Sequence, residues 1–192
     1  MKLRSFIAVE IPGEIQRAIQ RSTASLQNTL PKPMVRWVAT QNLHLTLKFM
    51  GDVTPEGLDH LAEALAAGLV MQRSFDMPVA GLGMFPTSQR PKIIWVGLEA
   101  PAALAGLQQN VDAIASRIGF RAEDRPYSPH LTLGRVGQSA SQTDLARIRT
   151  AIGAVSIGKL GTVHVEALTI FKSDLRPGGP IYSPLYTLPL KP

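Results

Sequence analysis

The sequence predicts an α+β fold with two lobes related by a pseudo-twofold axis, each an antiparallel sheet with helices, around a central cleft. Three observations support this prediction. Residues 44–47 and 130–133 carry the same tetrapeptide, His-Leu-Thr-Leu. Each copy lies in the same order of elements, which is strand, helix, His/Thr strand, helix, strand. Corresponding features of the two halves are 86 or 87 residues apart in the chain. We therefore interpret the chain as a duplicated fold.

The first half is defined by hydrophobic periodicity and by residues typical of element ends. Thr54 followed by Pro55 is typical of a helix N-cap and first helical position. Gly51 and Asp52, just before this helix, predict a turn. The predicted elements are a strand at 6–11, a helix at 15–30, the His/Thr strand from residue 44, a helix at 55–69 and a strand at 75–85, with residues 35–38 leading into the His/Thr strand.

The second half repeats this order. Gly119 is a typical stop after a helix, and Ser141 with Asp144 resembles a capping box. The predicted elements are a strand at 93–98, a helix at 101–118, the His/Thr strand from residue 130, a helix at 141–152 and a strand at 162–171. Pro184 and Pro189 cannot donate to a central ladder, so the tail predicts an edge strand and turn.

Together these elements predict one domain over residues 1–192. The two repeats extend over approximately 5–86 and 92–172, and the edge segment over 177–192. A length of 192 residues and a hydrophobic content of 45% are enough to bury a substantial core. No long charged or low-complexity run is present, so the composition is that of a folded globular chain.

The net charge and the cysteine content predict the kind of partner and the cellular compartment of the protein. The formal charge of +6 and the isoelectric point near 10.0 favour an anionic partner, such as nucleic acid or a phosphorylated small molecule. The chain has no cysteine, which excludes disulfides and thiolate metal sites and favours the reducing cytoplasm. The apolar run after residue 5 is too short for a signal peptide, and no stretch approaches transmembrane length.

The two His/Thr strands predict a site for acid–base chemistry. Side chains alternate along a strand, so His44 and Thr46 share one face while both leucines of the motif face the other. The same holds for His130 and Thr132. Two histidines with ordinary pKa values near 6.5 can supply a base and an acid. Threonine hydroxyls suit hydrogen bonds to the oxygens of a tetrahedral anion. In-line displacement at phosphorus uses this set of groups without a metal.

For four further residues the sequence gives weaker evidence of a functional role, or none. Lys48 shares the His44 face by alternation and is a candidate phosphate contact, although a surface lysine fits equally well. Arg135 falls on the opposite face unless its strand bulges or ends there, and it remains a candidate. His60 is predicted at the surface of a helix. His164, in an apolar strand, is predicted to be structural.

Two other kinds of site are not supported. Residues 153–160 nearly match a P-loop, but Leu160 replaces the Ser or Thr that would hold magnesium. The segment also follows a helix and precedes a strand, which is the reverse of a P-loop. A zinc site needs three or four convergent ligands, and neither motif contains a carboxylate. We therefore expect no cofactor and no metal.

At residues 44–51, His-Leu-Thr-Leu-Lys-Phe-Met-Gly, and 129–135, Pro-His-Leu-Thr-Leu-Gly-Arg, the sequence resembles the two-histidine (2H) phosphoesterase superfamily. Within it, the chain is similar to the RNA 2′,3′-cyclic phosphodiesterases, also called 2′-5′ RNA ligases. The similarity extends over the whole chain, including residues 6–12, 91–97 and 172–175. This family has a duplicated, bilobal α+β fold, as the repeat predicts.

The resemblance implies hydrolysis of a terminal RNA 2′,3′-cyclic phosphate to a 2′-phosphomonoester. By family analogy His44 is the proton donor and His130 the proton acceptor, an assignment that the internal symmetry leaves open from the sequence alone. Thr46 and Thr132 would bind the phosphate oxygens, and Arg135 would also contact phosphate.

The resemblance also implies RNA as partner and implies no protein partner of its own, and we expect a monomer. Phe49 is a candidate for packing beside the terminal nucleoside, with a core role as its alternative. Three other functions remain open: an ATP-independent 2′-5′ RNA ligase on the same site, a small-molecule cyclic phosphodiesterase, and a non-catalytic RNA-binding module. Ligation competes with water at about 55 M, so hydrolysis dominates unless the two RNA ends are held together.

Overall fold

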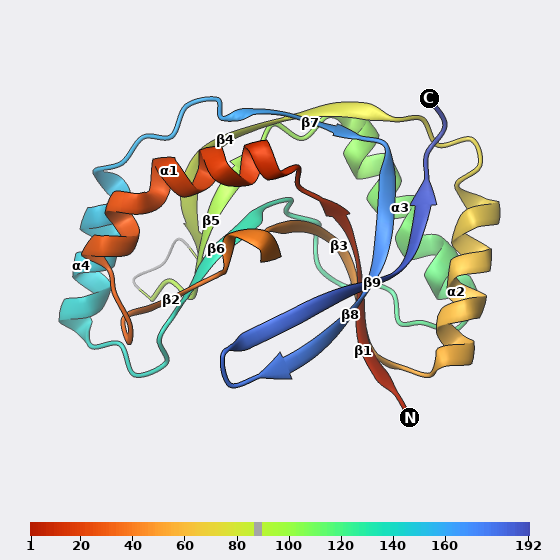
Figure 1. Cartoon of the computed structure of the whole chain (residues 1–192), viewed down its shortest axis with the longest axis horizontal. Helices are drawn as coiled ribbons and strands as arrows, with labels where there is room; N and C mark the ends of the chain where they lie inside the picture. The colour runs from red at the N-terminus through yellow and green to blue at the C-terminus, as the bar shows by residue number, and fades with distance from the viewer. Residues whose placement is uncertain (87–89) are drawn as a thin grey trace.

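The computed structural model describes residues 1–86 and 90–192 of the chain (Figure 1). The helices are α1 (Gly13–Thr29), α2 (Pro55–Gly68), α3 (Ala102–Arg117) and α4 (Gln142–Gly153), with a short 3₁₀ helix η1 (Thr40–Asn42). The strands are β1 (Leu3–Glu10), β2 (Val35–Trp37), β3 (His44–Val53), β4 (Phe75–Phe85), β5 (Ile93–Leu98), β6 (Leu131–Val136), β7 (Gly161–Val165), β8 (Ala167–Arg176) and β9 (Gly179–Pro189).

The described strands form one curled sheet in the order β7-β4-β5-β6-β3-β1-β8-β9, with β2 beside β6. Neighbouring strands are antiparallel throughout this order. The two His/Thr strands, β3 and β6, lie in the middle and pair with each other, while the helices lie at the two sides of the molecule (Figure 1). The predicted α+β fold with an antiparallel sheet is confirmed.

Each sequence repeat contributes its last strand to the half of the sheet that is built mainly from the other repeat. The last strand of the first repeat, β4, pairs with β5 of the second repeat, and β8 pairs with β1 of the first. The helices follow the same rule, because α1 packs with α4 and α2 packs with α3. Each half of the molecule in Figure 1 therefore contains elements of both repeats, and their exchange joins the two halves into one unit.

The core lies between the sheet and the helices. The four motif leucines are buried, at Leu45, Leu47, Leu131 and Leu133. This matches the alternation expected from the sequence, in which the His/Thr face looks away from the core. The two predicted helix starts are also present. The Thr54 hydroxyl accepts a hydrogen bond from the Gly57 N–H, and a reciprocal capping box begins α4.

Two predicted element boundaries are wrong. Gly51 and Asp52 do not turn the chain but lie within β3. The β1 pairing shifts there by one residue, and Gly51 has a φ of 72°, a left-handed conformation that glycine adopts without steric cost. The strand predicted at 162–171 is in fact two strands, β7 and β8, interrupted at Glu166. They pair with β4 and β1, in different halves of the sheet.

The C-terminal segment forms β9, which pairs with β8 along its whole length and lies at the edge of the sheet. Pro184 and Pro189 are therefore on a strand with one free side. Among the described residues, none of the helices has both the length and the apolar character needed to cross a bilayer.

Candidate active site

The two motif histidines are held by the same local hydrogen bond. The Nδ1 of His44 lies 2.7 Å from the carbonyl oxygen of Asn42, and the Nδ1 of His130 lies 2.7 Å from that of Ser128. A carbonyl oxygen only accepts, so Nδ1 carries the hydrogen in both rings. Each Nε2 therefore remains free to accept a proton when the ring is neutral and to donate one when it is charged.

The pairing of β3 with β6 brings the two motifs together. Leu45 pairs with Leu131, so the local pseudo-twofold axis passes between these two residues. In an antiparallel pair, residues on either side of this point lie close across the strands, and diagonal neighbours are about 7–8 Å apart at Cα. His44 and His130 are such a diagonal pair. The four His and Thr side chains consequently share one face, opposite the buried leucines.

A β-bulge follows the motif in β3. Thr46 pairs with Ala8 and Lys48 pairs with Ile7, so Leu47 is an extra residue on this strand. A bulge reverses the alternation of side chains after it. Leu47 and Lys48 are both buried in succession, which is the expected result.

The same bulge occurs in β6. Thr132 pairs with Trp95 and Gly134 pairs with Ile94, leaving Leu133 as the extra residue. Leu133 and Gly134 are again buried in succession. Gly134 allows β2 to approach closely, because a Cβ at this position would lie 2.8 Å from the side chain of Val35 and would force that side chain to move. The two bulges are related by the internal symmetry.

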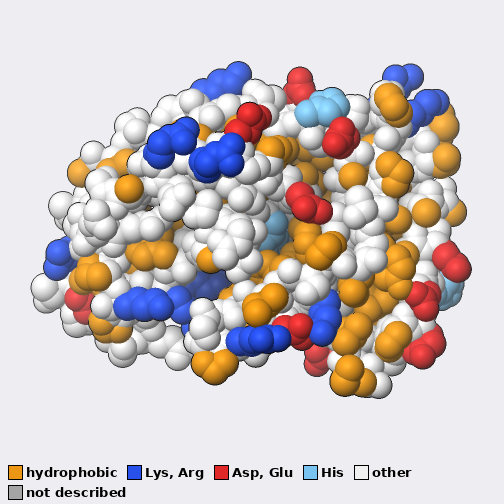
Figure 2. Space-filling model, viewed as in Figure 1, with side chains coloured by type: hydrophobic (Ala, Val, Ile, Leu, Met, Phe, Trp, Pro, Cys, Tyr) orange, Lys and Arg blue, Asp and Glu red, His pale blue; other side chains and the backbone are white. Residues whose placement is uncertain are grey.

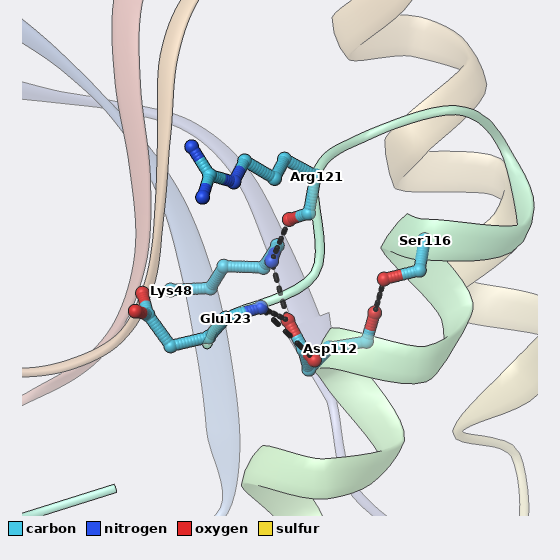
Figure 3. Close-up of polar contacts among 5 residues, drawn as sticks. All are labelled: Lys48, Asp112, Ser116, Arg121 and Glu123. Atoms are coloured by element: carbon cyan, nitrogen blue, oxygen red, sulfur yellow. Dashed lines mark hydrogen bonds and ion pairs between the residues drawn. The ribbon is translucent and has the colours of Figure 1, made fainter. Parts of the chain in front are cut away.

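The β3 bulge overturns the expected phosphate contact of Lys48. Its side chain is 3% exposed, and its Nζ donates to the Asp112 carboxylate of α3 and, at 2.7 Å, to the carbonyl oxygen of Arg121. Figure 3 shows Lys48 reaching toward α3 and the segment that follows it. This buried ion pair lies on the face of the sheet opposite the histidines, so strict alternation placed Lys48 on the wrong side.

Phe49 returns to the histidine face through the same bulge. Its side chain is 62% exposed, which excludes the core role considered for it. The centroid of its ring lies 6.2 Å from that of Phe6, which in turn lies 4.7 Å from the ring of His44. Phe49 is therefore an exposed aromatic side chain on the His44 side of the cleft.

Arg135 returns to the histidine face by the β6 bulge, and its charge acts on the site. Burial lowers the pKa of His44, the hydrogen bond to Asn42 opposes this, and the charges of Arg135 and His130 lower it further. The Arg135 charge also acts on Tyr182, whose pKa is raised by burial. Arg135 is therefore close enough to interact electrostatically with a group bound between the histidines.

Aromatic rings border both histidines. Tyr182 contacts the His44 ring edge-on with centroids 5.1 Å apart, and Phe85 contacts the His130 ring in the same way at 5.2 Å. Figure 2 shows a hollow in the middle of this face, with a histidine at its floor and Lys or Arg side chains beside it. The hollow can hold an anion between two groups able to transfer protons.

The other two histidines lie away from the site. His164 pairs with Asp76 on neighbouring strands β7 and β4, at 2.8 Å, and His60 is exposed on α2. In the described parts of the chain, 1–86 and 90–192, no group of three or more His, Asp or Glu side chains could hold a metal ion. Residues 153–160 connect the end of α4 to β7, as expected for a segment that is not a P-loop.

Comparison with known families agrees with the duplication. The family described as LigT-like phosphoesterase matches the chain twice in succession, at residues 9–95 and 96–182. The chain belongs to the LigT-like phosphoesterase family. Each of the two matches contains one His/Thr strand, so the LigT-like repeat is the unit that the sequence duplicates.

Relatives of this LigT-like phosphoesterase match it along almost its full length. The RNA 2′,3′-cyclic phosphodiesterase of Methanothermobacter thermautotrophicus is 34% identical over 185 residues, covering 95% of this chain and 96% of the relative. The protein of the same name from Escherichia coli K12 is 31% identical over 186 residues, covering 95% and 93%.

Solved structures show the same fold. Escherichia coli LigT complexed with 3′-AMP superposes with a TM-score of 0.77 at 27% identity, covering 99% of both chains. A protein of Thermus thermophilus gives a TM-score of 0.79 at 25% identity, covering 98% of both. The curled sheet with four helices is therefore the LigT-like fold.

Sequence reasoning singled out Phe49 but missed the other aromatic side chains near the two motifs. Phe85 is 86 residues from Phe171 and marks the repeat, but nothing local connects it with His130. Tyr182 lies in the C-terminal segment, and it reaches His44 only because β9 folds back on β8. Tyr127 precedes the second motif and donates from its hydroxyl to the Thr46 carbonyl oxygen at 3.1 Å.

Proposed function

We propose that this LigT-like phosphoesterase hydrolyses RNA ends bearing a 2′,3′-cyclic phosphate to 2′-phosphomonoesters, without a metal ion. One observation carries the proposal. Two histidines, each fixed through Nδ1 to the backbone, present free Nε2 atoms from paired strands on one face. An acid and a base on either side of one phosphorus atom are what in-line opening of a cyclic phosphate requires.

In the proposed reaction His44 is the acid and His130 is the base. The Nε2 of neutral His130 takes a proton from water as the water oxygen forms a bond to phosphorus. The P–O3′ bond breaks, and the Nε2 of protonated His44 gives its proton to the 3′ oxygen. The product is a 2′-phosphomonoester with a free 3′ hydroxyl. Proton exchange with solvent then restores both rings.

The pKa of His44 fits this role once substrate is bound. Burial and nearby positive charges lower it below its ordinary value in the free protein. An anionic phosphate beside the ring has the opposite effect, because it stabilises the charged imidazolium. Substrate binding therefore helps to create the protonated acid that the reaction uses.

Thr46, Thr132 and Arg135 complete the proposed site. The threonine hydroxyls share the histidine face and can donate to the non-bridging oxygens of the phosphate. The guanidinium of Arg135 stabilises the additional negative charge of the transition state. The relatives named RNA 2′,3′-cyclic phosphodiesterase and the formal charge of +6 support RNA as the substrate.

The test is product analysis with an RNA oligonucleotide that ends in a 2′,3′-cyclic phosphate, in buffer containing EDTA. We expect conversion to an oligonucleotide ending in a 2′-phosphate. Activity that is lost in EDTA and restored by zinc or magnesium would contradict the metal-free mechanism. An intact cyclic end on RNA that nevertheless binds the protein would indicate a binding module instead.

A further inference from the structure

A pocket of about 400 Å³ lies at the start of α3, between this helix and the segment that precedes β6. It is lined by residues 100–109 on one side and by residues 126–129 on the other. Its volume is within the range of small-molecule sites, which is roughly 300–1,000 Å³. None of the described residues that line it belongs to the two motifs or to the aromatic and arginine side chains that face the cleft. The pocket is therefore separate from the proposed catalytic site.

Gln108 lines this pocket with an amide group that has no hydrogen-bond partner in the described part of the chain. The residue is only 7% exposed. A buried amide without a partner destabilises a protein, because it gives up its hydrogen bonds to water and gains none in return. Among the described residues, the Nε1 of Trp95 is the unpartnered side-chain atom that is sealed from solvent. The Gln108 amide is not sealed in this way, so it borders the open space of the pocket.

The first repeat has an apolar side chain at the position of Gln108. Helix α1 begins at Gly13 and α3 begins at Ala102, so Ile19 and Gln108 occupy the same place in the two helices. Ile19 is 1% exposed and belongs to the hydrophobic core. Packing of this helix against the sheet therefore does not require an amide. In the second repeat the amide lies beside a pocket, where a bound molecule can supply its missing partner.

The pocket carries no formal charge. Its described lining contains no Lys, Arg, His, Asp or Glu. Tyr127 is the ionisable residue in this lining, and burial raises the pKa of its hydroxyl, which donates to the carbonyl oxygen of Thr46. A charged molecule would lose its hydration here without gaining a counter-charge. Leu104 and the rings of Pro101 and Pro129 supply apolar surface. The pocket therefore suits a neutral, largely apolar molecule.

We propose that this pocket is a binding site for a small neutral molecule that carries a carboxamide or lactam group. The amide of Gln108 has both a donor and an acceptor, so it can form two parallel hydrogen bonds with the N–H and C=O edge of such a group. The remainder of the molecule packs against the leucine and proline side chains. The inference goes beyond the proposed function and does not depend on it.

A molecule in this pocket lies against the segment that supports the second motif. The carbonyl oxygen of Ser128 holds the Nδ1 of His130 at 2.7 Å. The neighbouring Tyr127 reaches the first motif through its hydrogen bond to Thr46. The bound molecule therefore contacts the support of His130 from outside the cleft.

The test follows the binding of two bicyclic compounds by backbone-amide NMR titration of the full chain. The first is 2-quinolone, a neutral lactam, and the second is N-methyl-2-quinolone, which keeps the rings and the carbonyl but lacks the N–H. The variants are Gln108→Leu, which removes the amide, and Ala105→Phe, which fills the pocket. Gln20→Leu is the matched control, because Gln20 is an exposed glutamine of α1 that does not line the pocket.

We expect 2-quinolone to shift the signals of residues 100–109 and 126–129. Wild type should bind 2-quinolone about tenfold more tightly than the N-methyl compound, as one lost hydrogen bond that leaves a buried acceptor unpaired predicts. Gln108→Leu should remove this preference and bind 2-quinolone at least about tenfold more weakly than wild type. Ala105→Phe should weaken the binding of both compounds, and Gln20→Leu should bind both like wild type.

Three results would overturn the proposal. The first is the absence of shifts up to the solubility limit of 2-quinolone, and the second is equal affinity of wild type and Gln108→Leu for it. The third is a set of shifts centred on Phe49 and Thr132, which would place the compound in the cleft. Thermal unfolding without ligand adds an independent check. Gln108→Leu should unfold at the same or a higher temperature, because it removes an unpartnered amide, whereas a lower midpoint would show a structural role and contradict the proposal.

Discussion

Replacing Lys48 by Met removes a buried ammonium group and keeps an unbranched side chain of similar length. Asp112 then loses its ion-pair partner, although it keeps the backbone N–H of Glu123 at 3.2 Å (Figure 3). The side chains of Lys48 and Asp112 are 3% and 20% exposed. Breaking a buried pair costs roughly 3–5 kcal/mol, and the partial exposure of Asp112 places this pair near the lower end, at about 3 kcal/mol.

Urea unfolding measures this free energy of unfolding directly. We expect Lys48→Met to lower the transition midpoint with no change in the dependence on urea, since the surface exposed on unfolding is the same. Lys172→Met is the matched control. Its pair with Asp174 spans 2.9 Å, but the two side chains are 31% and 36% exposed, so the loss should stay below about 1 kcal/mol.

The same variant decides between the two roles considered for Lys48. As a structural residue it should leave kcat/KM within about tenfold of wild type in the folded protein. The double variant Lys48→Met/Asp112→Leu should recover stability, because an apolar pair can replace a buried ion pair. A loss of kcat/KM greater than about a hundredfold with unchanged stability would refute this reasoning and return Lys48 to the phosphate site.

Three other predictions concern the pH dependence and the stability of the fold. His44 must be protonated to act as the acid. We therefore expect kcat/KM to fall as the pH rises through the pKa of His44, which lies below the ordinary histidine value of 6.5. NMR titration of the His44 ring should show the same pKa. Arg135→Gln should lower kcat/KM. It should also move the fall of kcat/KM to higher pH, because one of the charges that lower the pKa of His44 is removed. If the fall stays at the same pH, the assignment of His44 as the acid is contradicted. Ser141→Ala should cost about 1 kcal/mol of stability through the lost N-cap of α4, with activity unchanged, as measured by urea unfolding and a turnover assay.

The duplicated fold and the central site could be predicted because their signals are local and repeated. Period-two alternation assigned His44 and Thr46 to one face, and the second copy made an accidental match implausible. Helix starts at Thr54 and Ser141 were predicted by the side chains that satisfy the first backbone N–H groups. These features depend on residues within one turn or one strand.

The remaining features depend on contacts that the sequence does not encode locally. The bulges at Leu47 and Leu133 insert one residue against a partner strand, so Lys48 faces the core while Phe49 and Arg135 face the cleft. Nothing in the single strand marks these insertions. The exchange of β4 and β8 between the halves likewise follows from long-range pairing, which hydrophobic periodicity does not define.

The central claim is that His44 and His130 act together on one phosphorus atom. Its most direct test is the rate of cyclic phosphate opening by His44→Ala, His130→Ala and the double variant. If the two rings act in a single step, each single variant should lose roughly 10²–10⁴-fold, and the double variant should be little slower than the slower single one. Losses that multiply in the double variant, or a single variant that keeps wild-type activity, would contradict a joint action of the two histidines.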